Sequence, residues 1–571
     1  MTTRLILAGL LAICLVLPSS AAEYVVDQSS PLASDQNSGT AEAPWQTIAK
    51  ANAMVQAGDT VTIKAGVYRE SLLPKVSGMP DHPITYQAAR LADGTFAAVV
   101  ISGADVFAGW ERDGAGWRYA GGTYGVKDSF LTYSTDFTFR REQVMCDGAQ
   151  LTQVSTREEL APGTFWVDAE TRALAIRLPH DDDPAGHVIE ASMRYPLCGS
   201  PDGKLTDLHI RGLIFRYSCN RAQWGAMRID ARWLVEDCTV EWSIGTGIGA
   251  QGENWILRRV RALHNGQIGL GGSGVEGLIE DCEFSDNNWK GFSAGWEAGG
   301  FKICNAWGVK VLNSVALRNR GPGMWFDIDN RACEVRQCRC QDNTASGIFI
   351  EISGDFLVTD NLCTGNGGRE PGDWAGAGIS LGESRDCYVA FNTCVGNQYG
   401  LSIRGQVPRF GGDEQTPAYR DENMTIRNNL LAYNQRAGFG LMWDNDFFGR
   451  HPNARDMSEQ EWQAGLAQRV VDPGTIGLVL DANYYACPDT PLVCWGVGWR
   501  DRSKVYHDLP TLQVEQGQER TGRSGEVSFA DRAVGDYQLT PSMAVVAKTV
   551  GLRYPAAGMV DIVAPAPEAG N

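Results

Sequence analysis

The sequence predicts an all-β protein: a right-handed parallel β-helix with an N-terminal capping helix and an inserted small β-sandwich-like module. Two observations predict the helix. Related segments recur every 22 to 24 residues where no loop intervenes, and particular residue types recur at fixed positions within them. Each coil of a solenoid buries its apolar face only by stacking on its neighbours, so a short period of this kind indicates stacked coils. A third observation, the loss of this period over residues 107–190, predicts the inserted module.

The repeat begins near residue 233 and defines three columns. The residues that align from coil to coil are Cys238, Val260, Cys282, Ser314, Cys338, Asn361, Asn392 and Asn429. Two positions later the column is small or apolar, which predicts an interior stack: Val240, Ala262, Phe284, Ala316, Cys340, Cys363, Cys394 and Leu431. Five positions after the aligned residues come Ser243, Asn265, Asn287, Asn319, Asn343, Asn366, Asn397 and Asn434. We expect these amides to stack at a turn, bonding to the backbone and to each other.

The N-terminal region divides into a leader and a cap. Residues 1–22 join Arg4 to a short apolar run and end in small residues, which is the pattern of a cleaved secretory signal rather than a membrane anchor. Residues 23–106 are expected to hold the cap and the first coils. A short amphipathic helix over 44–56 would protect the open edge of the first coil, and the segment 60–64 follows as a strand.

The remaining elements follow in chain order. Residues 107–190 show short alternating strands between Gly and Asp turns, and residues 191–450 form the main helix, with longer loops expected at 296–309, 367–375 and 405–422. Residues 451–571 are expected to add a capped amphipathic helix from Ser458 to Val470, final irregular coils and a loose tail. Cys487 and Cys494 are close enough in the sequence to suggest a local disulfide.

The charge limits the class of ligand. The chain has a formal net charge of −18, and removal of residues 1–22, which contain Arg4 and no acid, makes it −19. Such a surface repels nucleic acid and polyanionic polysaccharides, so a neutral oligo- or polysaccharide is the expected partner. The sequence has no pair of Cys-x-x-Cys motifs and no His-x-x-x-His, so we expect no zinc site. We expect no association with a membrane after signal cleavage, and the sequence does not indicate an oligomeric state.

Two segments one repeat apart carry the candidate chemistry: Gly-Met-Trp-Phe-Asp-Ile-Asp-Asn (323–330) and Gly-Ile-Phe-Ile-Glu-Ile-Ser-Gly (347–354). Side chains alternate across a strand, so the residues predicted to face inward are Met324, Phe326, Ile328, Ile348, Ile350 and Ile352. The residues left outward are Trp325, Asp327, Asp329, Phe349, Glu351 and Ser353. Counted from the glycine that opens each segment, one outward column contains Asp327, Glu351, Gly382 and Arg404.

The pair Asp327 and Glu351 has the arrangement of a glycosidase. Neighbouring strands lie about 4.8 Å apart, so the stacked carboxyls are expected roughly 5 Å apart, as in retaining enzymes. Two like charges at that distance do not both ionise cheaply, and one acid should have a raised pKa. Trp325 and Phe349 offer a sugar-stacking wall, and Gly382 leaves room for a ligand.

Four more residues complete the predicted site. Glu297 and Lys302 are expected to hold substrate hydroxyls, and Arg404 shares the column of the acids. Asp329 is a weaker substrate-binding candidate, because an outward acid on an acidic protein is usually solvated. We expect His264 to be a turn residue.

Two other functions stay open. Calcium held by Asp327, Asp329, Asn330 and Glu351, with Lys290 or Arg404 as base, would indicate a polysaccharide lyase, although that chemistry needs an acidic sugar. A non-catalytic glycan-binding surface protein is the third hypothesis. The first hypothesis needs no cofactor.

A family resemblance supports the first hypothesis. The N-terminal motifs Pro-Trp45-Gln-Thr-Ile, Gly-Asp59-Thr-Val and Gly-Val-Tyr68-Arg-Glu70 resemble secreted β-helix proteins of the pectate-lyase-like class. Glu297-Ala-Gly-Gly-Phe-Lys302, Met-Trp-Phe-Asp327 and Phe-Ile-Glu351-Ile-Ser resemble glycoside hydrolase family 120, β-xylosidases with a β-sandwich inserted in the helix. The resemblance spans most of residues 24–450. It implies Asp327 as nucleophile and Glu351 as acid/base. The first hypothesis is therefore a retaining glycoside hydrolase, exo-acting on plant or algal glycans, and the leader predicts that it is secreted or periplasmic.

Overall fold

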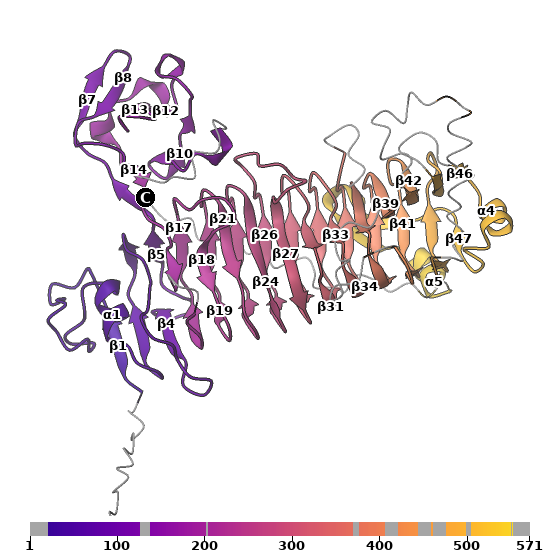
Figure 1. Cartoon of the computed structure of the whole chain (residues 1–571), viewed down its shortest axis with the longest axis horizontal. Helices are drawn as coiled ribbons and strands as arrows, with labels where there is room; N and C mark the ends of the chain where they lie inside the picture. Colours follow the sequence, from indigo (N-terminus) through magenta and orange to yellow (C-terminus); the bar gives the residue numbers. More distant parts are fainter. Residues whose placement is uncertain are drawn as a thin grey trace, which may run out of the picture.

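The chain winds into a long solenoid of parallel strands (Figure 1). The computed structural model describes residues 21–125, 137–200, 204–368, 376–405, 421–443, 476–497 and 504–549, with residues 419, 458, 460 and 551. The predicted leader (1–22), the helix expected from Ser458 to Val470 and the tail after 551 therefore lie almost wholly outside the described residues.

Three rows of strands run along the described solenoid, and each coil from β16 to β45 contributes one strand to each row. The first row, which later carries the acid pair, comprises β15 (Cys198–Gly199), β18 (Gly225–Ile229), β21 (Thr246–Ala250), β24 (Ile268–Val275), β27 (Gly299–Trp307), β30 (Met324–Asp327), β33 (Ile348–Glu351), β36 (Ala377–Gly382), β39 (Tyr399–Gly405), β42 (Ala437–Trp443) and β45 (Val493–Val497).

The second row begins at the N-terminus. It comprises β1 (Glu23–Val26), β2 (Thr60–Ile63), β4 (Ile84–Ala88), β16 (Leu208–Arg211), β19 (Leu234–Glu236), β22 (Ile256–Arg258), β25 (Leu278–Glu280), β28 (Lys310–Leu312), β31 (Arg331–Arg336), β34 (Gly354–Thr359), β37 (Arg385–Ala390), β40 (Thr425–Arg427) and β43 (Val479–Asp481).

The third row forms a sheet of its own. It comprises β3 (Gly66–Tyr68), β5 (Val99–Ser102), β17 (Ile214–Arg216), β20 (Thr239–Glu241), β23 (Arg261–Leu263), β26 (Glu283–Ser285), β29 (Val315–Leu317), β32 (Arg339–Gln341), β35 (Leu362–Thr364), β38 (Thr393–Val395), β41 (Leu430–Ala432), β44 (Tyr484–Ala486) and β47 (Arg523–Ser524). Its central side chains are the predicted interior column, which is fully buried from Val240 to Leu431.

The asparagine column is confirmed as a continuous ladder. From Asn265 to Asn434, the backbone N–H and the side-chain Nδ2 of each asparagine donate to the Oδ1 of the next one, and Nδ2 also donates to a backbone carbonyl. A second ladder at the aligned column runs through Asn361, Asn392, Asn429 and Asn483. Buried amides are satisfied in this way only when every coil keeps its register.

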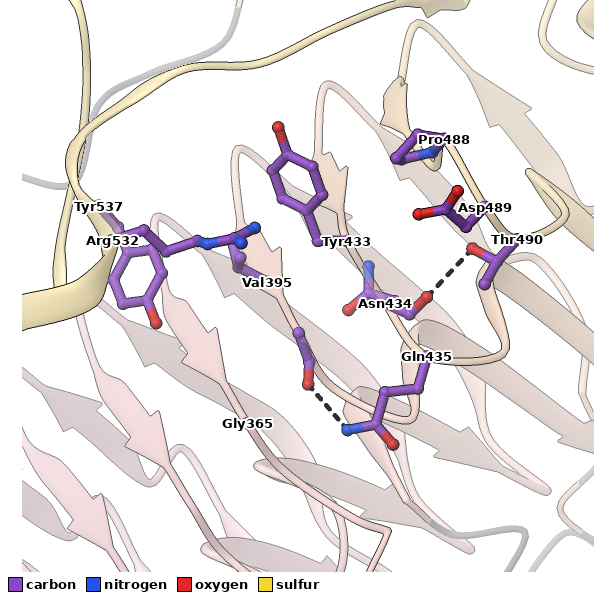
Figure 2. Close-up of a pocket in the computed structure, with 11 residues that line it drawn as sticks. Gly365, Val395, Tyr433, Asn434, Gln435, Pro488, Asp489, Thr490, Arg532 and Tyr537 are labelled. Atoms are coloured by element: carbon purple, nitrogen blue, oxygen red, sulfur yellow. Dashed lines mark hydrogen bonds between the residues drawn. The ribbon is translucent and has the colours of Figure 1, made fainter.

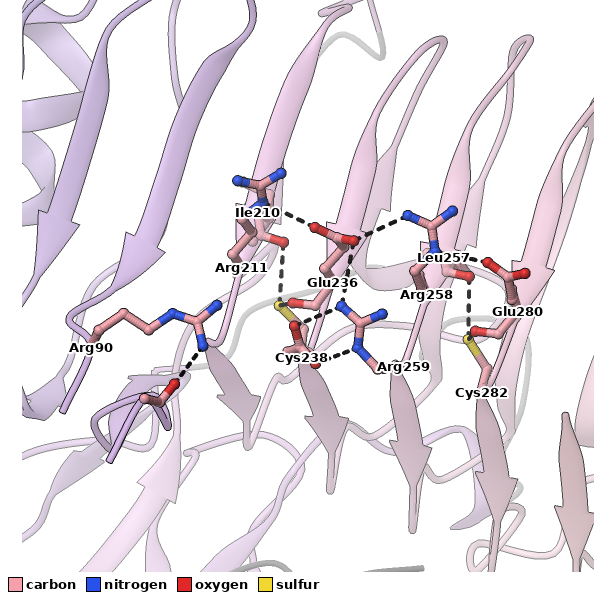
Figure 3. Close-up of polar contacts among 12 residues, drawn as sticks. Arg90, Ile210, Arg211, Glu236, Cys238, Leu257, Arg258, Arg259, Glu280 and Cys282 are labelled. Carbon is pink, nitrogen blue, oxygen red and sulfur yellow. Dashed lines mark hydrogen bonds and ion pairs between the residues drawn. The ribbon is translucent and has the colours of Figure 1, made fainter. Parts of the chain in front are cut away.

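Outward side chains on the second row form alternating ion pairs (Figure 3). Glu236 lies between Arg211 and Arg258, at N–O distances of 3.1 and 3.2 Å, and Arg258 reaches Glu280 at 2.8 Å. Opposite charges on neighbouring strands stabilise the chosen register by a modest amount, because the pairs remain partly solvated.

The ends of the solenoid are closed by helices. At the N-terminus α1 (Ile48–Met54) buries Ile48 and Ala51 against the first coil, and Thr47 caps it by accepting from the Lys50 N–H. At the other end β46 (Lys504–Tyr506) pairs antiparallel with β45, and α4 (Leu509–Gln516) buries Leu509 and Leu512 in the same core. A hairpin of β48 (Phe529–Asp531) and β49 (Asp536–Leu539), joined by η7 (Arg532–Val534), precedes α5 (Pro541–Thr549).

The inserted module stands beside the first coils (Figure 1). One of its sheets comprises β6 (Ala104–Val106), β9 (Val144–Cys146), β10 (Ala149–Gln150) and β14 (Ile189–Ser192). The other comprises β7 (Trp110–Asp113), β8 (Gly116–Tyr119), β11 (Thr152–Gln153), β12 (Thr164–Val167) and β13 (Leu174–Arg177). Residues from both sheets, including Val144, Ile189, Phe165 and Ile176, share one apolar core, which makes the module sandwich-like.

Two expectations are wrong. Residues 299–307 are not a loop but the nine-residue strand β27, whose glycines are needed for close packing: a Cβ at Gly300 would lie 2.2 Å from the Gly323 carbonyl oxygen. Cys487 and Cys494 are both free, as are the other cysteines of the described chain. Cys487 instead donates a weak Sγ hydrogen bond to the Leu431 carbonyl at 3.8 Å, and Cys494 lies in strand β45.

Candidate active site

The two acids lie on adjacent strands and directly opposite each other in the ladder, because Asp327 of β30 is paired in register with Glu351 of β33. The glycine that opens each strand is required by the asparagine ladder. A Cβ at Gly323 would come within 2.8 Å of the Asn343 Nδ2, and one at Gly347 within 2.9 Å of the corresponding atom of Asn366. The turn chemistry of the solenoid thus fixes the height at which each acid emerges.

The predicted alternation stops at Asp327. Ile328 and Asp329 adopt left-handed backbone angles, with φ of 59° and 54°, so Ile328 is only half-buried and does not face the interior as expected. Asn330, rather than Ile328, is fully buried, and its Oδ1 accepts a hydrogen bond from the Ala306 N–H. This turn directs Asp329 toward Arg331, at 2.7 Å, and toward the Tyr419 hydroxyl, which donates to it at 2.5 Å.

Lys302 pairs with Asp327. It emerges from β27 beside Trp325, and its Nζ lies 2.8 Å from Asp327 Oδ2 and 3.8 Å from the Trp325 ring centroid. The ammonium also donates to the Trp296 carbonyl at 2.9 Å. Asp327 Oδ1 is buried and has no hydrogen-bond partner among the described residues. One oxygen of the carboxylate is therefore neutralised, and the other is left unpaired.

The side chains of Trp325 and Phe349 stack on each other, two positions before the acids on the same two strands. Their ring centroids are 5.5 Å apart with an interplanar angle of 18°. Their exposed fractions are only 2% and 4%. The rings therefore stack on each other, whereas an open sugar-stacking wall would present an exposed ring face.

Glu351 has the raised pKa expected for one member of the pair. Burial is the main cause, and the charge of Asp327 adds to it, so that its pKa is about 7 although Arg404 and Lys302 act in the opposite direction. Arg404 of β39 lies two strands farther on, with a nitrogen 3.1 Å from Glu351 Oε1. Gly382 on the intervening strand leaves the space between them without a side chain.

Two further buried acids lie near Arg404 and were not predicted. Burial raises the pKa of Asp421 well above its usual range, the charge of Glu383 adds to this, and the Ser384 N–H and Arg404 oppose it. Both acids are nearly inaccessible. Neither belongs to a repeat column, so the sequence carries no signal that would bring them to Arg404.

Glu297 lies at the edge of a hollow on strands β18, β21 and β24, whose lining includes neither Asp327 nor Glu351. It accepts from the Gln223 side chain at 2.6 Å, and a Cβ at Gly271 would come within 3.3 Å of its carboxylate. The hollow has a volume of about 230 Å³ and is lined by Ser200, Gln223, Trp224, Gly225, Arg228, Ile229, Asp230, Gly249, Ala250, Gln251, Gly271, Gly272, Ser273 and Glu297. Its glycine floor continues the column of Lys302, since Gly249, Gly271 and Lys302 are consecutive partners in the ladder.

The oxygen ligands considered for calcium have separate partners. Asp329 pairs with Arg331, and the Asn330 side chain bonds to the backbone of Ala306 and Ile303. Lys290, one candidate base, donates to the Arg140 carbonyl at 2.6 Å. His264 is a turn residue with a φ of 50°, and its ring stacks on Trp242. Within the described chain, one group has metal-ligand spacing: Cys146, Asp147 and His187 in the inserted module, whose ligand atoms lie within 4.8 Å of one another.

Comparison with known proteins agrees on the fold. A family model for the right-handed β-helix region matches residues 225–394. The structure titled "The complex structure of XylC with xylose" aligns with a TM-score of 0.61 at 17% identity, over 82% of this chain and 86% of that one. The right-handed parallel β-helix predicted from the repeat is thereby confirmed.

Other matches are weaker or shorter. A structure titled "Glycoside hydrolase" aligns at 13% identity with a TM-score of 0.43, over 74% of this chain and 96% of that one. A PL6 family polysaccharide lyase from Pseudopedobacter saltans aligns at 10% identity with a TM-score of 0.42, over 86% and 94%. The Bacillus subtilis (strain 168) uncharacterized protein YwoF is 44% identical over 77 residues, 14% of this chain and 15% of that protein's length. These structural neighbours are carbohydrate-active enzymes of two reaction types.

The described helices are all too short or too polar to cross a lipid bilayer.

Proposed function

We propose that the protein is an exported retaining glycoside hydrolase that acts from the chain end of a neutral plant or algal glycan, as a β-xylosidase does. The observation that carries the proposal is the unequal environment of two adjacent acids. Asp327 keeps one buried oxygen without a partner beside an ammonium, and Glu351 has its pKa raised to about 7. Retaining glycosidases need this division of roles between a nucleophile and a general acid.

The reaction would proceed in two displacements. Asp327 Oδ1 attacks the anomeric carbon while Glu351 gives its proton to the departing glycosidic oxygen, so that a glycosyl ester forms and the aglycone leaves. Glu351, now a carboxylate, takes a proton from water, and the resulting hydroxide attacks the same carbon. Asp327 is released as a carboxylate, and the sugar leaves with its original anomeric configuration.

The neighbouring residues support these roles. Lys302 holds Asp327 Oδ2 and so orients the other oxygen, and Arg404 stabilises the ionised form of Glu351 that arises after the first step. The proposal of exo action rests on the likeness of the motifs around Asp327 and Glu351 to those of β-xylosidases. The apolar run and small residues of 1–22 support export.

The test is a panel of aryl glycosides with wild type, Asp327→Ala and Glu351→Ala. Glu334→Gln is the matched control. This acid lies on β31, in the second row of strands, and it too pairs with a cation, Arg336. We expect both alanine variants to lose about 10³-fold or more in kcat while the control keeps full activity. Azide should restore turnover in each alanine variant, with an inverted glycosyl azide from Asp327→Ala and a retained one from Glu351→Ala.

Three results would reject the proposal. Hydrolysis that survives both substitutions would show that another site acts, and an unsaturated uronate released from an acidic polysaccharide would identify a lyase. Binding of glycans with no turnover of any substrate would identify a non-catalytic protein.

A further inference from the structure

A second hollow lies on the third row of strands, near the C-terminal end (Figure 2). Its volume is about 590 Å³, and it is lined by Gly365, Val395, Gly396, Tyr433, Asn434, Gln435, Pro488, Asp489, Thr490, Arg532 and Tyr537. The acids Asp327 and Glu351 belong to the first row, so the two sites share no residue. Arg532 and Tyr537 come from the terminal hairpin, which folds over the solenoid at this point.

The hollow exists because one turn lacks a side chain. From β20 to β41, the residue after each third-row strand adopts a left-handed conformation, with φ between 50° and 58° at Trp242, His264, Asp286, Arg318, Asp342 and Tyr433. Gly396 takes the same position with a φ of 68°, so its backbone does not require glycine. A Cβ placed there would meet nothing within 4 Å, which means that the space above it is open. Gly365 differs, since a Cβ there would lie 2.4 Å from Asp342.

Aromatic rings form one side of the hollow. The Tyr433 hydroxyl donates to the Val527 carbonyl at 2.6 Å, which fixes its ring, and the Arg532 guanidinium lies 4.3 Å from the ring centroid. Tyr537 is held by an edge contact with Phe529, at 5.6 Å. Rings fixed in this way can receive the apolar C–H face of a pyranose with little further loss of conformational freedom.

Polar groups line the other side. Thr490 donates to the Asn434 carbonyl at 3.1 Å, and Gln435 donates to the Gly396 carbonyl at 3.3 Å, so both side chains are positioned. The Asp489 carboxylate is exposed and takes part in no ion pair among the described residues. A carboxylate and an amide opposite aromatic rings supply acceptors for sugar hydroxyls, which is the usual division of an oligosaccharide site into apolar and polar walls.

We propose that this hollow is a non-catalytic binding site for a neutral oligosaccharide. Its volume lies in the range of ligand pockets and exceeds that of the hollow beside Glu297. The lining has one acid, Asp489, and one base, Arg532, so the hollow has no net charge from its lining, and this favours a neutral sugar over a uronate. The site would hold the glycan on the solenoid while the acid pair works elsewhere on it. This binding does not depend on the proposed hydrolysis.

Affinity electrophoresis tests the site with soluble neutral arabinoxylan, galactomannan and hydroxyethylcellulose in the gel, and with polygalacturonate as the acidic comparison. The informative variants are Gly396→Trp, which fills the open space, and Tyr537→Ala, which removes a wall in the exposed hairpin. Gly114→Trp is the matched control, because Gly114 also has a positive φ, 62°, and open space around it, but lies in the inserted module.

We expect wild type and Gly114→Trp to be retarded by at least one neutral polysaccharide. Gly396→Trp and Tyr537→Ala should bind that polysaccharide about tenfold more weakly, the loss of roughly one aromatic contact. Turnover of aryl glycosides should be unchanged in both. The proposal is overturned if wild type is not retarded, if only polygalacturonate retards it, or if both variants bind as wild type does. Retardation that is lost only in Glu351→Gln would place the binding at the acid pair and would also overturn it.

Discussion

Replacement of Glu351 by glutamine should change how the stability of the protein depends on pH. The ordinary pKa of a glutamate is 4.5, and burial beside Asp327 raises that of Glu351 to about 7. The folded state therefore binds the proton more tightly than the unfolded state does. The contribution of this group to stability is fully present below pH 4.5 and is lost as the pH rises to about 7.

The size of the effect follows from the width of that window. One pKa unit corresponds to about 1.4 kcal/mol, so the difference between 4.5 and about 7 corresponds to roughly 3 kcal/mol in the free energy of unfolding. The side chain is only 14% exposed, so solvent screening reduces this figure little. Glu351→Gln cannot titrate and removes the whole pH-dependent contribution.

Guanidinium unfolding followed by tryptophan fluorescence, at about pH 5 and about pH 8, measures this contribution. We expect wild type to lose roughly 2 to 3 kcal/mol relative to Glu351→Gln between the two pH values, whereas Glu334→Gln should follow wild type throughout. The reasoning is refuted if the stability difference between wild type and Glu351→Gln is the same at both pH values. This experiment needs no substrate, so it tests the electrostatics of the acid pair apart from the proposed reaction.

Three other outcomes follow from the structure. The rate constant kcat/KM should fall above about pH 7 as Glu351 loses its proton, and Arg404→Met should move that alkaline limb to higher pH; a limb that stays in place would show that Arg404 does not act on Glu351. Asn343→Ala removes the acceptor of two buried Asn319 donors and should lower the free energy of unfolding by about 2 to 5 kcal/mol, against little change for Asn423→Gly, where the residue is exposed and glycine tolerates its φ of 54°. Alkylation of Cys487 and Cys494 in denaturant should add the same mass with and without reductant, since a disulfide between them would leave both unalkylated until it is reduced.

The solenoid could be predicted because its signal is local and repeated. Each asparagine of the ladder bonds to the next coil, so the same residue type is required at the same position every time. The register of Asp327 and Glu351 follows from the glycines at 323 and 347, whose small size that ladder requires. The repeat pattern was therefore sufficient to predict the stacked coils and the adjacency of Asp327 and Glu351.

What escaped prediction depends on single turns, on the close approach of neighbouring coils and on contacts of residues outside the repeat columns. The left-handed residues Ile328 and Asp329 end the alternation after β30, and no periodic signal marks where a strand turns. The strand β27 begins with two glycines, which resemble a loop until the close approach of the next coil explains them. Asp421 lies near Arg404 although it belongs to no repeat column, so no periodic signal links the two residues.

The asparagine ladder also bears on how such a protein can change its length. Every rung offers the same donors and the same acceptor to the coil on each side, so Asn319 would meet an equivalent amide if the coil that carries Asn343 were absent. Whole coils can in this sense replace one another. Gain or loss of one coil moves all later coils along the solenoid axis, and the same asparagine hydrogen bonds form again between the coils that become neighbours. The acids occupy two consecutive coils, and the hollow at Gly396 lies farther along the solenoid. The distance between them can therefore be set coil by coil, independently of the chemistry at either place.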